Sequence, residues 1–115
     1  MHYLLLIYGN EAPMLAASTE TAAKMIAAYA GFTEAMKKAG VYVGSNRLQP
    51  TASATTVRAP NGKTKTVDGP FAETNEQLGG PYMIEAPDLN GTFSWAARCL
   101  GVVQWAVEVR PIWAT

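Results

Sequence analysis

The sequence is short of charge, histidine and cysteine. Only 16% of its 115 residues are charged, and nine basic residues cancel nine acidic ones. No basic cluster is longer than Lys37-Lys38, so the electrostatic footprint of a nucleic-acid-binding surface is missing. The single cysteine, Cys99, excludes an internal disulfide and suits a reducing compartment. With one histidine, one cysteine and no clustered carboxylates, we expect no metal site.

Long apolar runs and phosphate-binding loops are also missing. The first apolar run, from Tyr3 to Tyr8, is too short for a signal sequence and lacks a cationic flank. No run approaches the ~20 residues of a membrane helix. The glycines match neither a P-loop nor a dinucleotide-binding fingerprint, and we expect no cofactor. These absences predict a cytoplasmic protein that binds neither a membrane nor nucleic acid directly.

What the chain does contain is a substantial apolar load. Hydrophobic residues make up 49% of it, including three Trp, five Tyr and five Met. Its length predicts one domain over residues 1–115. A small domain buries a limited fraction of its surface, so association is an accessible way to hide the rest. We therefore expect a homodimer, the commonest closed assembly.

The first half of the chain predicts a strand, a long helix and a second strand. The run Tyr3–Tyr8 is typical of a central strand buried on both faces. Residues 13–18 are interpreted as a connector. A helix over 19–39 has an apolar stripe at spacings of four and three, a cap at Ser18 or Thr19 and a stop at Gly40. Residues 41–43 then predict a short strand.

The second half predicts a hairpin, a strand, a helix and a last strand. Residues 51–58 and 64–67 favour two strands that meet at Asn61-Gly62, a strong hairpin signal. Gly79-Gly80-Pro81 opens a strand over 82–86. Asp88 or Asn90 caps a helix, and a final strand covers about 105–110. The apolar face predicted for this helix is Leu89, Phe93, Ala96, Ala97 and Leu100.

This order of elements predicts an α+β fold. Two helices, each between strands, match a ferredoxin-like split βαβ pattern with an inserted β-hairpin.

Several motifs resemble those of the YCII-related family, in the subgroup called DGPF proteins. The most specific block is Val67-Asp68-Gly69-Pro70-Phe71-Ala72-Glu73-Thr74, followed by Glu76-Gln77-Leu78-Gly79-Gly80. Further matching motifs are Tyr3-Leu4-Leu5-Leu6-Ile7-Tyr8-Gly9, Val41-Tyr42-Val43-Gly44, Leu48-Gln49-Pro50-Thr51, Ala54-Thr55-Thr56-Val57-Arg58, Trp95-Ala96-Ala97-Arg98 and Val107-Glu108-Val109-Arg110-Pro111. Together they cover nearly the whole chain.

The resemblance implies a fold of the dimeric α/β-barrel type, in which two sheets pack face to face. It also implies an association with extracytoplasmic-function sigma factors, whose genes often lie beside those of DGPF-type proteins. Some members of the wider family carry a His–Asp pair in a pocket. The only histidine here is His2, outside these motifs, so we expect no imidazole general base.

Asp68 and Glu73 are the candidate catalytic residues. Two carboxylates near a pocket can divide acid and base roles when their environments separate their pKa values. The alternative is structural, because Asp before Gly-Pro commonly caps its own turn.

Four further side chains are candidates for ligand binding: Arg58, Tyr8, Tyr82 and Phe71. Arg58, like Arg47 and Arg110, is of the type that clamps a carboxylate; the alternative is a solvated residue or an ion pair with Glu108 or Glu85. Tyr8 and Tyr82 each lie at the end of a strand, where a phenol can enter a cleft. Most of the other aromatic residues are expected in the core or an interface. Cys99 is expected to be buried and inert.

Two functions therefore remain open, beside a third possibility that the chain only assembles with itself. The first is a dimeric small-molecule-binding or regulatory module for a small apolar or acidic ligand. The second is an enzyme that uses carboxylate acid–base chemistry on a small aromatic-derived or lactone-like substrate, by analogy of fold.

Overall fold

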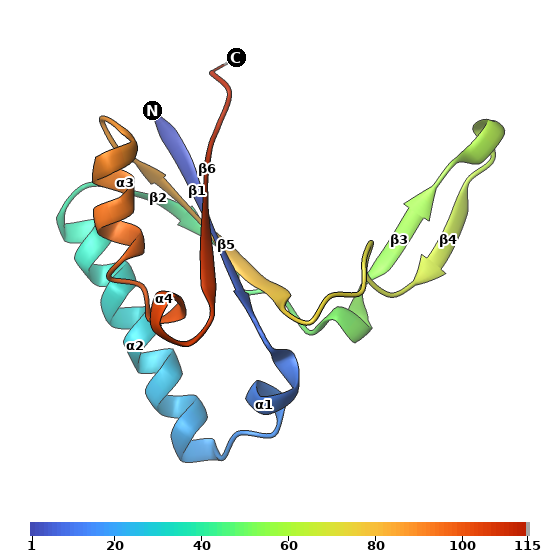
Figure 1. The fold of residues 1–115 in the computed structure, drawn as a ribbon, viewed down its shortest axis with the longest axis horizontal. Coiled ribbons are helices and arrows are strands. Elements are labelled where there is room, and N and C mark those ends of the chain that lie inside the picture. Colours follow the sequence, from blue (N-terminus) through green and yellow to red (C-terminus); the bar gives the residue numbers. More distant parts are fainter. Residues whose placement is uncertain (115) are drawn as a thin grey trace.

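The computed structural model describes residues 1–114, apart from the side chains of residues 103 and 104. Figure 1 shows a sheet with its helices on one side and a separate hairpin that projects from the body. The strands are β1 (His2–Gly9), β2 (Tyr42–Ser45), β3 (Thr55–Arg58), β4 (Lys65–Asp68), β5 (Gln77–Glu85) and β6 (Ala106–Pro111). The helices are α1 (Glu11–Leu15), α2 (Thr19–Lys38), α3 (Leu89–Ala96) and α4 (Leu100–Gln104), with 3-10 turns at Thr51–Ser53 and Pro60–Gly62.

Alternating burial along β1 positions the main sheet. Tyr3, Leu5 and Ile7 point toward the helices and are buried, while the residues between them are only partly covered. The sheet is antiparallel with the order β2-β5-β1-β6, so β1 is central as predicted. This arrangement confirms the α+β, ferredoxin-like fold. The sequence predicted that β1 is buried on both faces. In the single chain only the face toward the helices is buried, and the other face is partly exposed.

Helix α2 forms where its local signals predicted it. Ser18 is the N-cap, and its hydroxyl accepts a hydrogen bond from the Thr21 amide at 3.1 Å. At the other end Gly40 takes a φ of 74°, and the Val41 amide donates back to the Met36 carbonyl at 3.1 Å. That geometry is a Schellman stop, which a glycine with positive φ favours.

The connector predicted over residues 13–18 is wrong in its first part, because α1 begins at Glu11. Asn10 caps this short helix by accepting from the Ala12 amide at 3.2 Å. Pro13 lies in the first turn, where a helix does not need its amide hydrogen. Pro13 is therefore compatible with a helix here, although it marked the start of the predicted connector.

Strand β5 begins at Gln77, five residues before the predicted start at Tyr82. It runs straight through Gly79, Gly80 and Pro81. The Pro81 carbonyl accepts from the Asn46 amide at 3.2 Å, so the backbone of Pro81 faces β2, which ends at Ser45. Pro81 has no amide hydrogen to donate, but at this position β2 has already ended, so no strand hydrogen bond is lost. β2 itself is shifted to 42–45 from the predicted 41–43.

The predicted apolar face of α3 is confirmed at Ala96 and wrong at Leu89 and Phe93. Asp88 caps the helix as expected, accepting from the Gly91 amide at 2.8 Å, but Thr92 and Ala96 are the buried residues. Leu89 and Phe93 are 41% and 50% exposed. Thr92 is accommodated in the core because its hydroxyl donates to the Asp88 carbonyl at 3.2 Å. The helix stops at Ala96, and Leu100 opens α4 instead of continuing α3.

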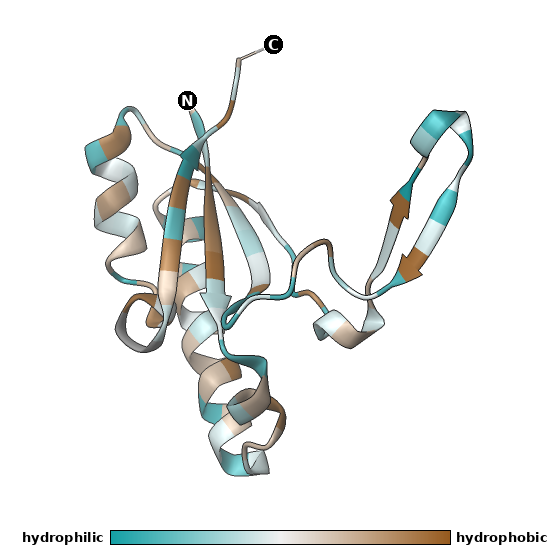
Figure 2. Cartoon of the chain, turned by 45° about the vertical axis from the view of Figure 1, so that its right-hand side comes forward, coloured by the Kyte–Doolittle hydropathy of each residue, from teal (hydrophilic) through white to brown (hydrophobic). Residues whose placement is uncertain are grey.

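Strands β3 and β4 form the predicted hairpin, here called the arm (residues 55–67). The turn has Asn61 at φ 56° and Gly62 at φ 78°, the two positive values that the Asn-Gly pair predicted. The stretch predicted as strand from residue 51 opens instead with a 3-10 turn, Thr51–Ser53. The arm is a two-stranded sheet of its own, and Figure 2 shows it separate from the apolar strands of the body.

The core lies between the sheet and its helices. Its buried residues are Tyr3, Leu5, Ile7, Phe32, Met36, Tyr82, Ile84, Ala86, Ala96 and Cys99. No helix of residues 1–114 covers the opposite face of the sheet, which is here called the open sheet face (Figure 1). The residues that alternate with the core set on β1 and β5 point there, among them Leu4, Leu6, Tyr8, Pro81 and Met83. In the described part of the chain, no helix has the length and apolarity needed to cross a membrane.

Candidate functional site

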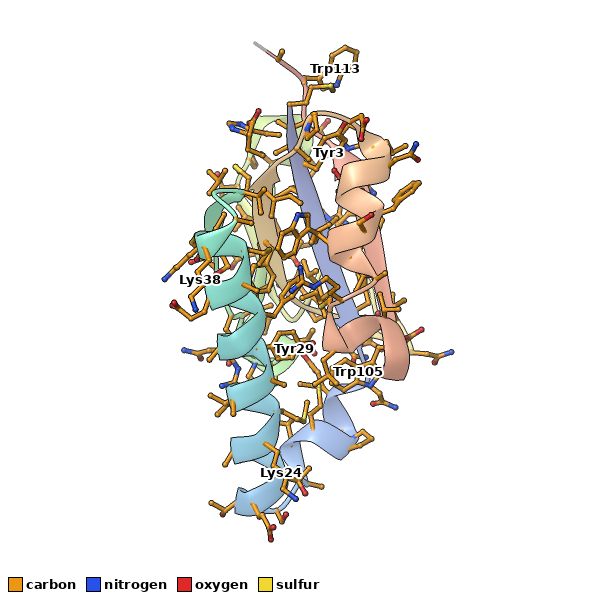
Figure 3. All side chains as sticks on the ribbon, turned by 90° about the vertical axis from the view of Figure 1, so that its left-hand side faces the viewer. Tyr3, Lys24, Tyr29, Lys38, Trp105 and Trp113 are labelled. Atoms are coloured by element: carbon orange, nitrogen blue, oxygen red, sulfur yellow. The ribbon has the colours of Figure 1, made fainter. Side chains whose placement is uncertain are left out.

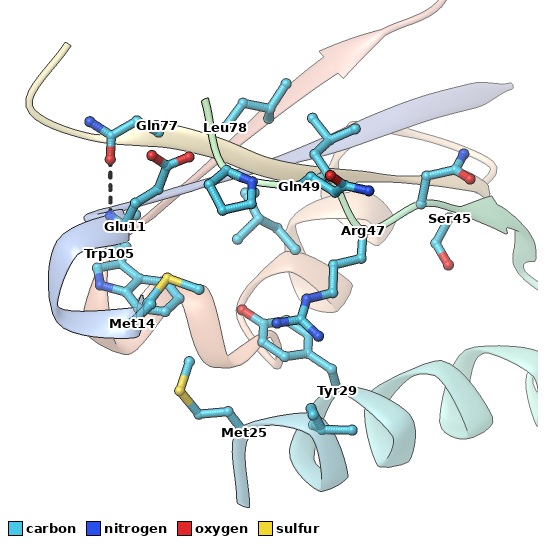
Figure 4. Close-up of a pocket in the computed structure, with 18 of the residues that line it drawn as sticks. Glu11, Met14, Met25, Tyr29, Ser45, Arg47, Gln49, Gln77, Leu78 and Trp105 are labelled. Atoms are coloured by element: carbon cyan, nitrogen blue, oxygen red, sulfur yellow. Dashed lines mark hydrogen bonds between the residues drawn. The ribbon is translucent and has the colours of Figure 1, made fainter. Parts of the chain in front are cut away.

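A pocket of about 550 Å³ lies on the helix side of the sheet, and it is the candidate site. The ends of β1 and β5 form one wall, and α1 and α2 form the others. The segment 45–50, which continues β2, borders it as well (Figure 4). Most of its lining is apolar and includes Ile7, Met14, Leu15, Met25, Ile26, Leu48, Leu78 and Trp105. Its size is in the range of small-molecule sites.

The glycines of the most specific sequence block create part of this hollow. Gly79 and Gly80 line the pocket and contribute no side chain. A Cβ atom on Gly80 would lie 2.1 Å from the Asn46 carbonyl oxygen, so only glycine fits beside that backbone. Gly9 has a similar role at another wall, because a Cβ there would lie 2.5 Å from the Trp105 ring. Figure 3 shows Trp105 and Tyr29 on the helix side of the sheet.

Arg47 is the cationic group of the pocket. The Asn46 amide donates to Pro81 at 3.2 Å and the Leu48 amide donates to Gly79 at 2.9 Å, so the backbone on both sides of Arg47 is tied to β5. The side chain extends from this segment in the direction of α2 (Figure 4). Within the described residues, no carboxylate lies in ion-pair distance of its guanidinium. A fixed backbone therefore presents a free bidentate donor to the cavity.

Glu11 is the carboxylate of the pocket, and its oxygens are already engaged. The Thr51 amide and hydroxyl each donate to it at 2.8 Å. The Glu11 amide donates to the Gln77 side-chain oxygen at 2.9 Å, as Figure 4 shows. Glu11 thus fastens α1 to both ends of the segment that carries the arm.

Two phenols complete the polar lining. Burial raises the pKa of Tyr82, whose hydroxyl lies 2.9 Å from the Thr33 hydroxyl. Burial, together with the nearby Cys99, raises the pKa of Tyr29, and its hydroxyl has no hydrogen-bond partner among the described residues. Burial also raises the pKa of Cys99, a buried thiol as predicted. These groups stay protonated at neutral pH, so they offer hydrogen bonds and not charge.

Of the six residues predicted for catalysis or ligand binding, Tyr82 lines the pocket, and so does Arg47, which the sequence offered beside Arg58 as a possible carboxylate clamp. Tyr8 points to the open sheet face, in the register position opposite Ala106. Asp68 ends β4, and Glu73 and Phe71 lie on the exposed segment that leads back to β5. Arg58 is on the arm, with its guanidinium 5.2 Å from the Phe71 ring centroid. The roles predicted for these residues stay predictions, and the pocket does not bring them together.

The turn at Asp68 is held by its neighbours. The Gly69 amide donates to the Ala54 carbonyl at 2.7 Å, and the Thr56 hydroxyl donates to the Gly69 carbonyl at 2.9 Å. In the described chain no hydrogen bond reaches the Asp68 carboxylate. Gly69 has a φ of 114°, which a residue with a side chain rarely adopts.

The remaining chemistry-bearing side chains lie away from the pocket. The His2 Nε2 atom lies 2.8 Å from the Glu85 carboxylate, and both residues are half exposed. Arg110 pairs with Glu108 through its Nε atom at 2.7 Å, as the structural alternative predicted. No cluster of three potential metal ligands occurs among the described residues.

Sequence reasoning missed α1 as a wall of the pocket. Asn10 followed by Glu11 carried a usable signal, because a cap with an acidic residue in the first turn is typical of a helix start.

Comparison with known proteins identifies relatives but no activity. A family model described as "YCII-related domain" matches residues 1–115. An uncharacterised protein of Rhizobium meliloti (strain 1021) is 35% identical over 114 residues, which is 97% of this chain and 92% of that protein. The DGPF subgroup and its sigma-factor association stay predictions.

Proposed function

The chain belongs to the YCII-related domain family, and from that premise we propose a dimeric module that binds a small, largely apolar molecule carrying an acidic group. The observation that carries the proposal is the pocket of about 550 Å³ with apolar walls and one free guanidinium, that of Arg47. Apolar walls supply affinity, and a few placed polar groups fix the orientation of a ligand. The carboxylate of Glu11 is held by Thr51, so Arg47 is the charged group of the pocket left to pair with a ligand carboxylate.

The apolar rim of the pocket supports the same ligand class. Leu15, Ile26 and Leu48 are 67%, 55% and 46% exposed around the cavity. Exposed apolar side chains that gather at one place mark a binding site more often than an ordinary surface. We propose that a ligand covers them.

Binding is preferred to acid–base catalysis because of where the carboxylates lie. Asp68 and Glu73 are exposed and do not line the pocket. Glu11 does line it, but both of its oxygens accept hydrogen bonds from Thr51. A general base must reach the proton that it removes, and the pocket offers no free carboxylate for that role.

The proposed dimer forms through the open sheet face. Leu4, Leu6, Tyr8 and Met83 gather there without a covering helix. Burying such side chains contributes about 25 cal/mol per Å² of apolar surface. A cytoplasmic location is part of the proposal, since the free thiol of Cys99 fits a reducing compartment.

The test uses naphthalene-2-carboxylate and its uncharged amide as probes. Ligand-observed NMR or calorimetry should show binding of the carboxylate to the wild-type protein. The variant Arg47→Gln should weaken binding of the carboxylate about tenfold, the loss of one charge-assisted contact, and hardly change binding of the amide.

The matched control is Arg98→Gln, which removes the same charge from a side chain that packs over Trp95 outside the pocket. It should bind both probes as the wild type does. Equal weakening by the two substitutions, or an equal loss for both probes with Arg47→Gln, would contradict the proposed role of Arg47.

A further inference from the structure

The arm is an element without a packing partner in the single chain. Every residue of the arm except Thr56 is exposed. Its hydrogen bonds, within the described chain, stay inside the arm and its own base. An isolated two-stranded hairpin is marginally stable at best in water. The radius of gyration is 16.1 Å, above the ~13 Å of a compact chain of this length.

The arm also exposes apolar side chains on both of its faces. Thr56 pairs with Val67 and Val57 pairs with Thr66, so the two valines point to opposite faces. They are 54% and 60% exposed, and Phe71 at the base of the arm is 78% exposed. Large apolar side chains on a free-standing element favour a covering surface.

Charge is segregated along this part of the chain. The only charged residues of the arm are basic: Arg58, Lys63 and Lys65. The segment that leads back to β5, here called the return segment (residues 68–76), has only acidic ones: Asp68, Glu73 and Glu76. None of these six side chains forms an ion pair among the described residues.

We infer that the arm docks on a second copy of this chain, with its basic residues against the acidic return segment of that copy. A two-fold axis makes such a contact twice, because each copy supplies one basic arm and one acidic segment. About a two-fold axis both contacts of each copy are used within the pair, so the assembly closes at two copies. It gives the acidic residues of the most specific block, Asp68, Glu73 and Glu76, a role in assembly, while Gly79 and Gly80 of the same block line the pocket.

The inference rests on the proposed dimer and adds a defined contact to it. The open sheet face supplies the apolar area of the dimer interface. The arm fixes how the two copies are oriented, because turning one copy end for end would place like charges opposite each other. The arm and the return segment also lie, in the sequence, between two segments that line the pocket, residues 45–50 and 77–80.

The test exchanges charges between the two partner surfaces. The arm variant Lys63→Glu/Lys65→Glu and the return variant Glu73→Lys/Glu76→Lys each place like charges opposite one another at both contacts. Sedimentation velocity should show a rise of about tenfold or more in the dimer dissociation constant for each variant at about 50 mM salt, and a smaller rise at about 0.5 M salt. The four substitutions together should restore the wild-type dissociation constant.

A matched control is Lys24→Glu/Lys38→Glu, which makes the same change in net charge on the exposed surface of α2. A wild-type monomer at micromolar concentration would remove both the proposed dimer and the docked arm. A wild-type dimer that the arm variant weakens no more than the control does would overturn the arm contact alone. Failure of the combined variant to restore association would overturn the pairing of arm with return segment.

A second measurement needs no substitution. A zero-length carbodiimide joins a lysine to a carboxylate only when they are in contact. In a mixture of ¹⁴N- and ¹⁵N-labelled chains, mixed-isotope peptides linking Lys63 or Lys65 to Glu73 or Glu76 are expected. Links between these residues that are exclusively single-isotope would place the contact within one chain and overturn the inference.

Discussion

The substitution Gly80→Ala tests most sharply how the sequence creates the pocket. The added Cβ would lie 2.1 Å from the Asn46 carbonyl oxygen and 3.4 Å from the Arg47 Cα atom. Both neighbours are backbone atoms, so no flexible side chain can move aside. The segment 45–50 must shift away from β5 instead.

The cost of that shift can be worked from its parts. Gly80 has a φ of 158°, and such a conformation costs a residue with a side chain about 1–3 kcal/mol. The hydrogen bonds from Asn46 to Pro81 and from Leu48 to Gly79 lie on either side and contribute about 1 kcal/mol each. Because relaxation relieves some of the strain, we expect Gly80→Ala to lower the free energy of unfolding by about 2–5 kcal/mol.

The adjacent glycine provides the control. A Cβ on Gly79 would meet only the Ile7 carbonyl oxygen at 3.6 Å, an ordinary contact. Gly79→Ala should therefore change the free energy of unfolding by no more than about 1 kcal/mol. Urea denaturation followed by tryptophan fluorescence compares the two. Variants within 1 kcal/mol of each other would refute this explanation of the glycine pair.

Three further predictions follow from the contacts around the pocket and the arm. Glu11→Ala removes two hydrogen bonds from Thr51 and should lower the free energy of unfolding by about 1.5–3 kcal/mol in urea titration; an effect below 0.5 kcal/mol would show that the link between α1 and Thr51 is not formed. Asp68→Ala should be nearly neutral, within ~0.5 kcal/mol, because no hydrogen bond reaches its carboxylate in the described chain; a loss above 1 kcal/mol would restore the capping role. Burial raises the pKa of Tyr29 and Cys99 above their ordinary values of 10.0 and 9.0, so the unfolded chain releases these protons first and stability should fall as pH rises above 9. Tyr29→Phe should make that fall shallower in urea midpoints measured across the alkaline range, and an unchanged slope would contradict the assignment.

Local signals in the sequence were enough for the elements that depend on them. Ser18 and Gly40 set the ends of α2, and Asn61-Gly62 sets the hairpin turn, because caps and turns are decided by neighbouring residues. Asp88 set the start of α3 in the same way.

Elements that depend on distant contacts were not predicted. Helix α1 is held through Glu11, whose partners are 40 and 66 positions away in the sequence. The passage of β5 through Pro81 depends on where β2 ends, which no local pattern specifies. Thr92 occupies the core in place of Phe93 because its hydroxyl finds a backbone acceptor one turn earlier.

The candidate site shows the same division. The sequence predicted that Gly79-Gly80-Pro81 opens a strand, but the part that this glycine pair plays in the pocket depends on the approach of Asn46, which follows β2. Tyr82 was predicted as a ligand-binding residue and does line the pocket. Asp68 and Glu73, the carboxylates of the most specific motif, were predicted as catalytic residues, but they lie outside the pocket.

The central claim, that ligand binding occurs in the pocket and not at the motif carboxylates, is tested most directly by where a ligand acts. A ¹H–¹⁵N correlation spectrum titrated with naphthalene-2-carboxylate reports every backbone amide at once. We predict shifts that concentrate at residues 11–15, 45–50 and 77–80 and leave residues 55–73 unchanged. Shifts centred on Asp68 and Glu73, or spread over the open sheet face, would contradict the account.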